Sequence, residues 1–215
     1  MFFSVKKNKL TICGAITGGV IGCFIFLGAR FTGIAIIGLF FLLGTLATSW
    51  KINTKEKLGA AEKNIGRRTA SQVVANGGVA GITGLLSWFF VEQRELFQLM
   101  LAGALASATA DTLSSELGTV YGKKFYNILS FKYDKRGENG VVSIEGALFG
   151  IAGSMLIATV YAIGFGWGSH FFFIVIAGTL GNIADSILGA TLERKHYLKN
   201  TLLAALTAML LIKPF

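Results

Sequence analysis

Long apolar runs alternate with shorter polar connections along the whole chain. A helix needs about 20 apolar residues to cross a bilayer. We expect helices over seven runs, the last of them short: about 10–29, 33–49, 72–91, 97–119, 146–165, 170–192 and 200–213. The pattern therefore predicts an all-α fold, a polytopic membrane helical bundle of about seven transmembrane helices that forms a single integral membrane domain over residues 1–215.

The composition argues against an ordinary soluble domain. Hydrophobic residues make up 53% of the 215 residues, charged residues only 14%, and the mean hydropathy is +0.64. The 28 glycines supply small surfaces through which membrane helices approach one another closely. The single proline, Pro214, leaves the predicted helices uninterrupted.

The distribution of basic residues predicts the orientation of the chain. In a membrane protein the net charge of +9 has a topological meaning first, so we expect no nucleic-acid partner. If the connections alternate between two sides, one side receives only Arg30, Arg94 and Lys213, and the other receives the remaining 17 of the 20 Lys and Arg residues. Basic residues accumulate on the cytoplasmic side. We therefore expect a multi-pass protein of the cell membrane with a cytoplasmic N-terminus. Its first apolar run is too long for a secretory signal peptide and lacks a small-residue cleavage site.

Four carboxylates interrupt the apolar segments. Asp111, Glu116, Glu145 and Asp185 lie within or at the ends of predicted helices. An acid inside a membrane costs several kcal/mol, so it is rare and usually marks an ion, proton or phosphate site. In the predicted topology all four lie in the cytoplasmic half of the bundle, beside the longest hydrophilic loops. We therefore expect an active site that faces the cytoplasm.

Helical spacing brings two of these acids together. Small and polar residues recur every three or four positions around each of them: Gly103, Ser107, Asp111, Ser114 and Gly118 on one helix, and Gly178, Asn182, Asp185 and Gly189 on another. Such small-residue stripes face other helices rather than lipid. Two adjacent carboxylates stay ionised when a divalent cation lies between them, and oxygen ligands suit Mg²⁺. The spacing therefore predicts that Asp111 and Asp185 lie close enough to share such an ion.

The other polar residues have simpler explanations as well. A lone intramembrane Ser, Asn or Gly more often serves helix packing than chemistry. Glu116 is explained equally well as a functional acid or as a neutral, hydrogen-bonded or interfacial one. Topology already accounts for the basic loops. Arg67 and Arg68 are a stronger case for phosphate binding, because guanidinium groups grip phosphates bidentately and these two stand directly before a polar helix start.

Three stretches resemble the signature motifs of a known family. They are residues 66–78 (GRRTASQVVANGG), 108–118 (ATADTLSSELG) and 181–191 (GNIADSILGAT). They look like the three signature stretches of the transmembrane protein 19 family, and the resemblance extends through most of the chain after about residue 30. That family includes the plant phytyl-phosphate kinase of vitamin E synthesis and many uncharacterised prokaryotic members.

A more distant resemblance assigns roles to these motifs. Residues 111–125, 142–146 and 181–186 are similar to elements of the CTP-dependent polyprenol kinases and CDP-diacylglycerol synthases. This resemblance implies that Asp111, Asn182 and Asp185 hold a metal ion, and that Asp111, Asp185 and Glu116 take part in catalysis. It also implies contacts to nucleotide or phosphate by Arg67, Arg68, Ser71, Asn76, Lys123, Ser143 and Glu145.

The chain departs from these patterns at three places. Val142 stands where the distant relatives carry lysine, and Asn182 where they carry aspartate. The last family motif has an acid on each side of an asparagine, whereas this chain reads Lys199-Asn200-Thr201. The resemblance implies that the loss of both acids removes one metal anchor, so either Asp185 and Glu116 suffice or the activity of this chain is altered.

The motifs together predict a membrane-embedded, Mg²⁺-dependent phosphotransferase. It would transfer phosphate from a nucleoside triphosphate, with CTP favoured, to an isoprenoid monophosphate in the bilayer such as phytyl or geranylgeranyl phosphate. Cytidylyl transfer to a lipid phosphate is the enzymatic alternative, and a cation-coupled membrane transporter is the alternative from another class. Transport is less favoured, because the acids cluster on one side and no proline breaks a helix. Membrane lipids are expected partners, and the sequence also allows a homodimer.

Overall fold

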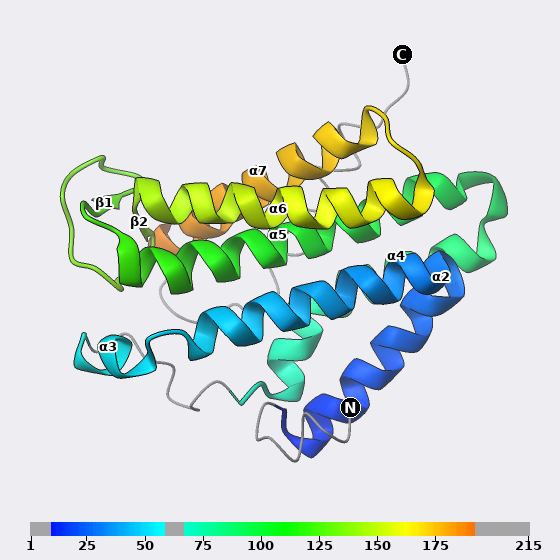
Figure 1. The fold of residues 1–215 in the computed structure, drawn as a ribbon, viewed down its shortest axis with the longest axis horizontal. Helices are drawn as coiled ribbons and strands as arrows, with labels where there is room; N and C mark the ends of the chain where they lie inside the picture. The colour runs from blue at the N-terminus through cyan, green and yellow to red at the C-terminus, as the bar shows by residue number, and fades with distance from the viewer. Residues whose placement is uncertain (1–9, 59–66, 192–215) are drawn as a thin grey trace.

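The computed structural model describes residues 10–58 and 67–191, and over these ranges the chain is mostly helical (Figure 1). The long helices run back and forth between the two ends of one bundle. In chain order the elements are α2 (Ile12–Ser49), α3 (Ile52–Lys57), α4 (Ala70–Phe89), the 3-10 helix η1 (Val91–Gln93), α5 (Arg94–Tyr121), the strands β1 (Tyr126–Asn127) and β2 (Val141–Val142), α6 (Ile144–Phe165) and α7 (His170–Thr191).

Helix α2 is broken at Arg30 into two arms, residues 12–29 and 31–49, and the chain reverses direction between them (Figure 1). Arg30 has a φ of 50° and a ψ of −139°, which lies outside the helical region. Its guanidinium group lies over the rings of Phe26 and Trp88, at 5.9 Å and 5.3 Å from their centroids. The two arms correspond to the first two helices expected from the sequence.

Helix α5 is the centre of the bundle. It packs against α2, α4, α6 and α7, and every residue from 101 to 110 is buried. This stretch, LAGALASATA, consists of small and aliphatic residues, so neighbouring helices can approach its backbone closely. Asp111 follows it directly, and its position is therefore fixed by a helix that is held on several sides.

Among residues 10–58 and 67–191, four helical segments are long and apolar enough to cross a membrane: Ile12–Ser49, Val91–Tyr121, Ile144–Phe165 and His170–Thr191. Helix α4 is not among them, although it has 20 residues. The predicted all-α membrane fold is confirmed, whereas the count of seven spans and the cytoplasmic N-terminus stay predictions. The expected short helix over 200–213, and the altered motif around Asn200 with it, lie outside the described residues.

The connection between α5 and α6 contains a β-hairpin, where the sequence indicated only a hydrophilic loop. Strands β1 and β2 pair antiparallel, with Tyr126 opposite Val142 and Asn127 opposite Val141. Gly140 precedes β2 and has a φ of 73°, and a Cβ added there would lie 2.2 Å from the Cβ of Ala190 in α7. Glycine is needed at this contact for its conformation and its size. The contact holds the hairpin against the end of α7.

Candidate functional site

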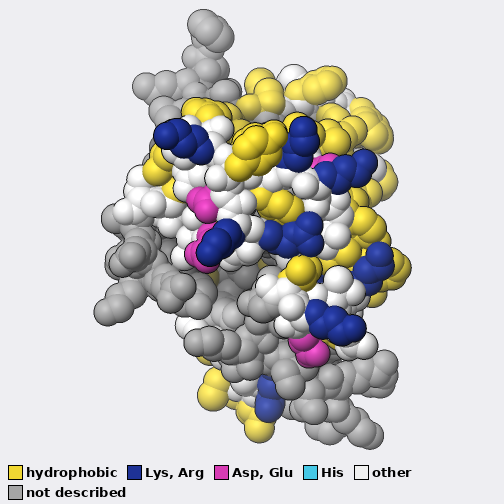
Figure 2. Space-filling model, turned by 90° about the vertical axis from the view of Figure 1, so that its left-hand side faces the viewer, with side chains coloured by type: hydrophobic (Ala, Val, Ile, Leu, Met, Phe, Trp, Pro, Cys, Tyr) yellow, Lys and Arg dark blue, Asp and Glu magenta, His cyan; other side chains and the backbone are white. Residues whose placement is uncertain are grey.

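Several helix ends meet at one end of the bundle, which we call the basic end. There α2, α5 and α7 end, α6 begins, and the β1–β2 hairpin lies (Figure 1). Trp50 Nε1 donates a 2.8 Å hydrogen bond to Tyr121 Oη, which joins the ends of α2 and α5. Figure 2 shows the basic end face on, with Lys and Arg side chains spread over it and acidic groups between them. Within 10–58 and 67–191, all Lys and Arg residues except Arg30 and Arg94 lie on the connections at this end or directly before α4.

A cavity of about 320 Å³ lies at the basic end between α5, α7 and the hairpin. We call it the carboxylate cavity because most of its side chains carry oxygen. Its polar lining residues are Asp111, Ser114, Ser115, Glu116, Thr119, Glu138, Asn139, Ser143, Asn182, Asp185 and Ser186. The structure thus brings the three predicted catalytic acids, the predicted metal ligand Asn182 and Ser143 to one cavity.

Asp111 and Asp185 face each other between α5 and α7. Their carboxyl groups lie within hydrogen-bonding reach of each other, and Glu116 lies near enough to interact electrostatically with Asp111. Asn182 lies about one turn before Asp185 and is buried. Gly150 of α6 makes room for it, since a Cβ there would lie 2.8 Å from Asn182 Nδ2. The close approach of three helices therefore holds these side chains together.

The donor set of this cavity fits a Mg²⁺ ion that keeps part of its coordination for other ligands. Proteins usually hold Mg²⁺ by one or two carboxylates, with waters and substrate phosphates in the remaining positions. Among residues 10–58 and 67–191, no group of three or more His, Cys, Asp or Glu side chains is placed to hold a metal ion. A bound Mg²⁺ would therefore rest on the Asp111–Asp185 pair and the Asn182 amide oxygen, and would need phosphates to complete its shell.

Lys55 of α3 is a buried cation at the edge of this cavity, and the sequence did not single it out. Its side chain is only 1% exposed, and Nζ lies 2.5 Å from Glu116 Oε2. Nζ also donates hydrogen bonds to the carbonyl oxygens of Ala47, at 2.6 Å, and Thr48, at 3.4 Å. Glu116 is thus one half of a buried ion pair. Because Lys55 lies in a lysine-rich loop, the charge rule for membrane topology already explained it, and no pattern marked it as buried.

The start of α6 carries two more of the predicted residues. Ser143 is buried, and its Oγ accepts a 3.0 Å hydrogen bond from the Gly146 N–H, so it caps the helix. Beside this cap a Cβ on Gly118 would lie 2.9 Å from Gly146 Cα, which brings α5 and α6 into backbone contact. Glu145 Oε2 accepts a 3.4 Å hydrogen bond from the Lys123 backbone N–H. Glu145 and Lys123 lie next to the cavity but do not line it.

The hairpin contributes residues that sequence reasoning missed. Arg136 Nη2 donates a 2.9 Å hydrogen bond to the Gly122 carbonyl, and its guanidinium carbon lies 4.6 Å from the centre of the Phe125 ring. Phe125, Glu138 and Asn139 line the carboxylate cavity. These residues lie in an irregular loop, where no helical or strand period could have located them.

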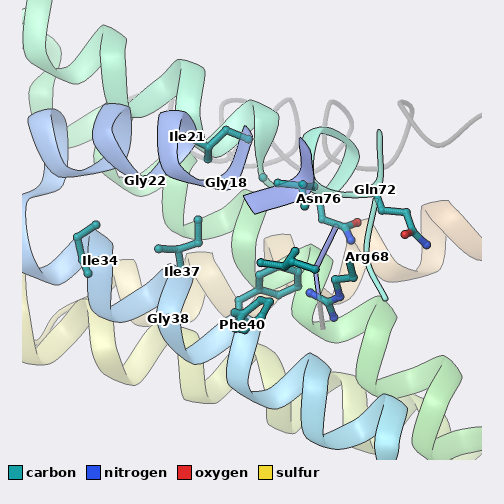
Figure 3. Close-up of a pocket in the computed structure, with 15 residues that line it drawn as sticks. Gly18, Ile21, Gly22, Ile34, Ile37, Gly38, Phe40, Arg68, Gln72 and Asn76 are labelled. Carbon is teal, nitrogen blue, oxygen red and sulfur yellow. The ribbon is translucent and has the colours of Figure 1, made fainter. Parts of the chain in front are cut away.

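The remaining predicted residues lie at and near the start of α4 and do not line the carboxylate cavity. Arg68 and Asn76 line a second cavity of about 400 Å³, bounded by the two arms of α2 and the start of α4 (Figure 3). We call it the apolar groove. Arg67 Nε donates a 3.4 Å hydrogen bond to the Leu10 carbonyl, and Ser71 is exposed. The structure therefore places some of the predicted site residues in two separate cavities, whereas Arg67, Ser71, Lys123 and Glu145 line neither of them.

Comparison with known proteins identifies the family of this chain. The family described as "Integral membrane protein DUF92" matches residues 1–207. Over 205 residues the chain is 31% identical to the chloroplastic protein VTE6 of Arabidopsis thaliana, and the match covers 91% of this chain and 61% of VTE6. The chain thus spans less than two thirds of the length of that relative.

Two further relatives match over a larger share of their length. An uncharacterised membrane protein of Methanocaldococcus jannaschii is 31% identical over 200 residues, which are 91% of this chain and 80% of that protein. Protein PGR of Arabidopsis thaliana is 28% identical over 217 residues, covering 89% of this chain and 75% of PGR. No solved structure matches the chain significantly. The chain therefore belongs to the integral membrane protein family DUF92, and the resemblance of its three motifs to the transmembrane protein 19 family is confirmed.

Proposed function

We propose that the protein is a membrane-embedded, Mg²⁺-dependent phosphotransferase that moves the γ-phosphate of a nucleoside triphosphate, with CTP favoured, to an isoprenoid monophosphate. The observation that carries this proposal is the pairing of Asp111 with Asp185, beside Asn182, in an oxygen-lined cavity. Two facing carboxylates in membrane helices can both stay ionised when a divalent cation lies between them, and Mg²⁺ is commonly bound jointly by carboxylates and nucleotide phosphates. A metal–nucleotide complex is such a partner.

In the proposed reaction a phosphate oxygen of the lipid attacks the γ-phosphorus of the nucleotide. The bond from the γ-phosphorus to the β–γ bridging oxygen breaks, so a nucleoside diphosphate leaves and the lipid becomes a diphosphate. Phosphoryl transfer depends on alignment of the reactants and on neutralisation of charge on the transferring group. Mg²⁺ held by Asp111, Asp185 and Asn182 would supply that neutralisation.

Other residues of this chain prepare the cavity for an anionic ligand. Lys55 neutralises Glu116 and so removes one charge that would repel nucleotide phosphates. The guanidinium group of Arg136 adds a positive charge next to Phe125, and Phe125 lines the cavity. The exposed hairpin residues Glu138 and Asn139 also form part of that wall.

The choice of an isoprenoid acceptor is supported by similarity. The chain is 31% identical to VTE6, and its motifs resemble a family that includes a phytyl-phosphate kinase. This similarity favours phytyl or geranylgeranyl phosphate as the acceptor. The basic residues gathered at the same end as the carboxylate cavity support a site that faces the cytoplasm of a cell membrane. Cytidylyl transfer to a lipid phosphate would use the same residues and release pyrophosphate.

The position of a radioactive label decides between these reactions. Purified protein in nanodiscs is incubated with Mg²⁺, geranylgeranyl or phytyl monophosphate, and CTP labelled at either the γ- or the α-phosphorus. We expect label from γ-labelled CTP in the lipid and none from α-labelled CTP. Label transferred only from the α-position would establish cytidylyl transfer instead. No labelled lipid with CTP, ATP or GTP, from protein that remains folded, would reject both reactions.

A further inference from the structure

The apolar groove is a cavity to which the phosphotransfer chemistry assigns no role. It occupies about 400 Å³, and its walls come from the two arms of α2 and the start of α4. Figure 3 shows Ile34 and Ile37 on the second arm pointing across the groove toward the first arm, where Ile21 lies. Most of the lining is aliphatic, aromatic or glycine. Walls of this kind suit a hydrocarbon chain.

Glycines open this groove instead of closing it. Gly18 and Gly22, one turn apart on the first arm, and Gly38 on the second arm all line the cavity. A Cβ added at Gly22 or at Gly38 would meet no atom within 4 Å. Glycine is therefore not needed at these two positions for close packing among the described residues, and a larger side chain at either position would extend into the space between the arms.

One end of the groove is polar. Arg68, Gln72 and Asn76 lie together there, as Figure 3 shows. The Arg68 guanidinium carbon lies 5.1 Å from the centre of the Phe40 ring and 5.8 Å from that of Phe41. Arginine is a common partner of phosphate groups because of its fixed positive charge. A phosphate bound where the apolar walls end would therefore meet a positive charge.

We propose that the apolar groove binds the isoprenoid chain of a lipid monophosphate, with the phosphate against Arg68 and Asn76. This inference rests on the proposed function, because it names where the acceptor of that reaction binds. The described lining includes Arg68 but no Asp or Glu, so its charge suits an anionic head group. The lipid and the nucleotide would then occupy different cavities.

The second arm of α2 connects the polar end of the groove to the carboxylate cavity. A Cβ added at Gly44 would overlap the Arg68 guanidinium group, so Arg68 packs directly against this turn of helix. Ala47 lies three residues further on, roughly 4.5 Å along the helix axis, and its carbonyl accepts the 2.6 Å hydrogen bond from Lys55. Lys55 in turn pairs with Glu116, which lines the carboxylate cavity. These contacts link the polar end of the groove to the wall of the carboxylate cavity, and the proposed reaction then requires the lipid phosphate to move from Arg68 into that cavity.

The experiment measures lipid binding in the absence of nucleotide and Mg²⁺, so that it does not depend on catalysis. Full-length protein in nanodiscs is titrated with labelled geranylgeranyl monophosphate, and geranylgeraniol and phosphatidic acid serve as competitors. Gly38→Leu places a side chain in the open groove, and we expect it to weaken binding by about tenfold or more. Leu42→Phe adds bulk to the exposed face of the same arm, outside the groove, and we expect unchanged binding.

A second variant tests the polar end. Arg68→Ala should reduce the affinity for the monophosphate to that for geranylgeraniol, while the affinity for the alcohol itself stays the same. Arg68→Lys should restore part of the difference, because it keeps the charge but not the bidentate geometry. If Gly38→Leu does not yield folded protein, two other variants replace it. Gly22→Leu fills the groove from the first arm of α2, and Gly38→Ala places a smaller group at the original position.

The outcomes separate this inference from the proposed function. Wild-type affinity in folded Gly38→Leu and Gly22→Leu would overturn the assignment of the groove. Displacement by phosphatidic acid at equal concentration would assign the groove to membrane phospholipid and would also overturn it. Loss of binding in the groove variants supports the inference even where the wild-type protein transfers no phosphate, in which case only the proposed reaction fails.

Discussion

The acids of the carboxylate cavity differ in what they contact. Asp111 and Asp185 face each other, whereas Glu116 is held by the buried ammonium group of Lys55. Lys55 contacts Oε2 of Glu116 and offsets the charge of this carboxylate, so Glu116 attracts a second cation less strongly than the aspartate pair does. A metal ion in this cavity would therefore rest mainly on the aspartate pair.

The aspartate pair carries the first prediction. Asp111→Asn and Asp185→Asn each remove a charged oxygen ligand while keeping the shape of the side chain. We expect each to lower the rate of γ-phosphate transfer by at least about 10²-fold, because electrostatic stabilisation of the transferring group depends on the metal. The measurement is the initial rate with γ-labelled CTP over a series of Mg²⁺ concentrations. Glu92→Gln, an exposed acid on η1, is the control. A wild-type rate in either aspartate variant would remove that residue from the metal site.

The ion pair of Lys55 carries the second prediction. Lys55→Met keeps most of the volume of the side chain but leaves Glu116 without its cation. Removing one partner of a buried ion pair destabilises a protein by about 3–5 kcal/mol, whereas removing both costs much less. Lys55→Met should therefore lower the unfolding temperature in detergent strongly, and the double variant with Glu116→Leu should recover most of the loss. Lys57→Met, on the same short helix but exposed, should have no effect. If Lys57→Met lowers the unfolding temperature as much as Lys55→Met does, the loss of stability does not come from the burial of Lys55.

Sequence reasoning located some of these residues and could not have located others. The helical period alone placed Asp111 and Asp185 on facing stripes, because each stripe repeats over several turns of a regular helix. Lys55 had no such pattern, since α3 spans only Ile52–Lys57. Its burial results from contacts with Ala47 and Glu116, which come from other elements and leave no local trace in the sequence.

At the scale of helices, glycine serves two opposite purposes in this fold. At the crossing of α2 and α4, a Cβ on Gly28 would lie 2.0 Å from the Gly84 carbonyl oxygen, and a Cβ on Gly84 would lie 2.8 Å from the Phe24 carbonyl oxygen. Here glycine allows backbones to touch. In the apolar groove, Gly22 and Gly38 instead leave space. The composition predicted close packing for all glycines, and only the three-dimensional arrangement distinguishes the two cases.

The crossing of α2 and α4 carries the third prediction. Gly28→Ala places a methyl group against the Gly84 backbone, which cannot move without separating the helices. Overpacking of this kind costs about 1–3 kcal/mol. Gly22→Ala is the matched control on the same helix arm, and it should leave stability unchanged or raise it by up to about 1 kcal/mol, because the methyl group meets no neighbour and glycine is a poor helix former. Both are measured by unfolding in detergent. Equal effects of the two substitutions would show that the crossing is not tightly packed.

The helix limits were predictable to within a few residues, because apolar runs end sharply at charged connections. The run expected over 97–119 is the helix Arg94–Tyr121, and the run over 146–165 is Ile144–Phe165. The hairpin was not predictable, since strands of two residues are too short for an alternating pattern. The apolar groove could not be predicted either, because it depends on how the two arms of α2 are arranged in space and not on the sequence of either arm.

At the scale of the whole molecule, the two ends of the bundle differ in charge and in chemistry. The basic end holds the carboxylate cavity. The second arm of α2 lies between this cavity and the polar end of the apolar groove, since it contacts Lys55 through Ala47 and Arg68 through Gly44. At the opposite end, around Arg94 and His170, His170 Nε2 lies 3.5 Å from Glu95 Oε1. Nucleotide would have to arrive at the basic end, so the orientation of the bundle decides whether the proposed reaction can draw on cytoplasmic CTP.

The orientation can be tested by labelling single cysteines from outside intact cells that carry the protein in their plasma membrane. The native Cys13 and Cys23 are exposed and are first replaced by alanine. Lys132→Cys then marks the hairpin at the basic end, and Ser169→Cys marks the connection between α6 and α7 at the other end. Because basic residues are retained in the cytoplasm, a membrane-impermeant maleimide should label Ser169→Cys in intact cells and Lys132→Cys only after the cells are opened. The opposite result would place the carboxylate cavity outside the cell, away from nucleoside triphosphates, and a phosphotransferase that draws on cytoplasmic CTP would no longer be tenable.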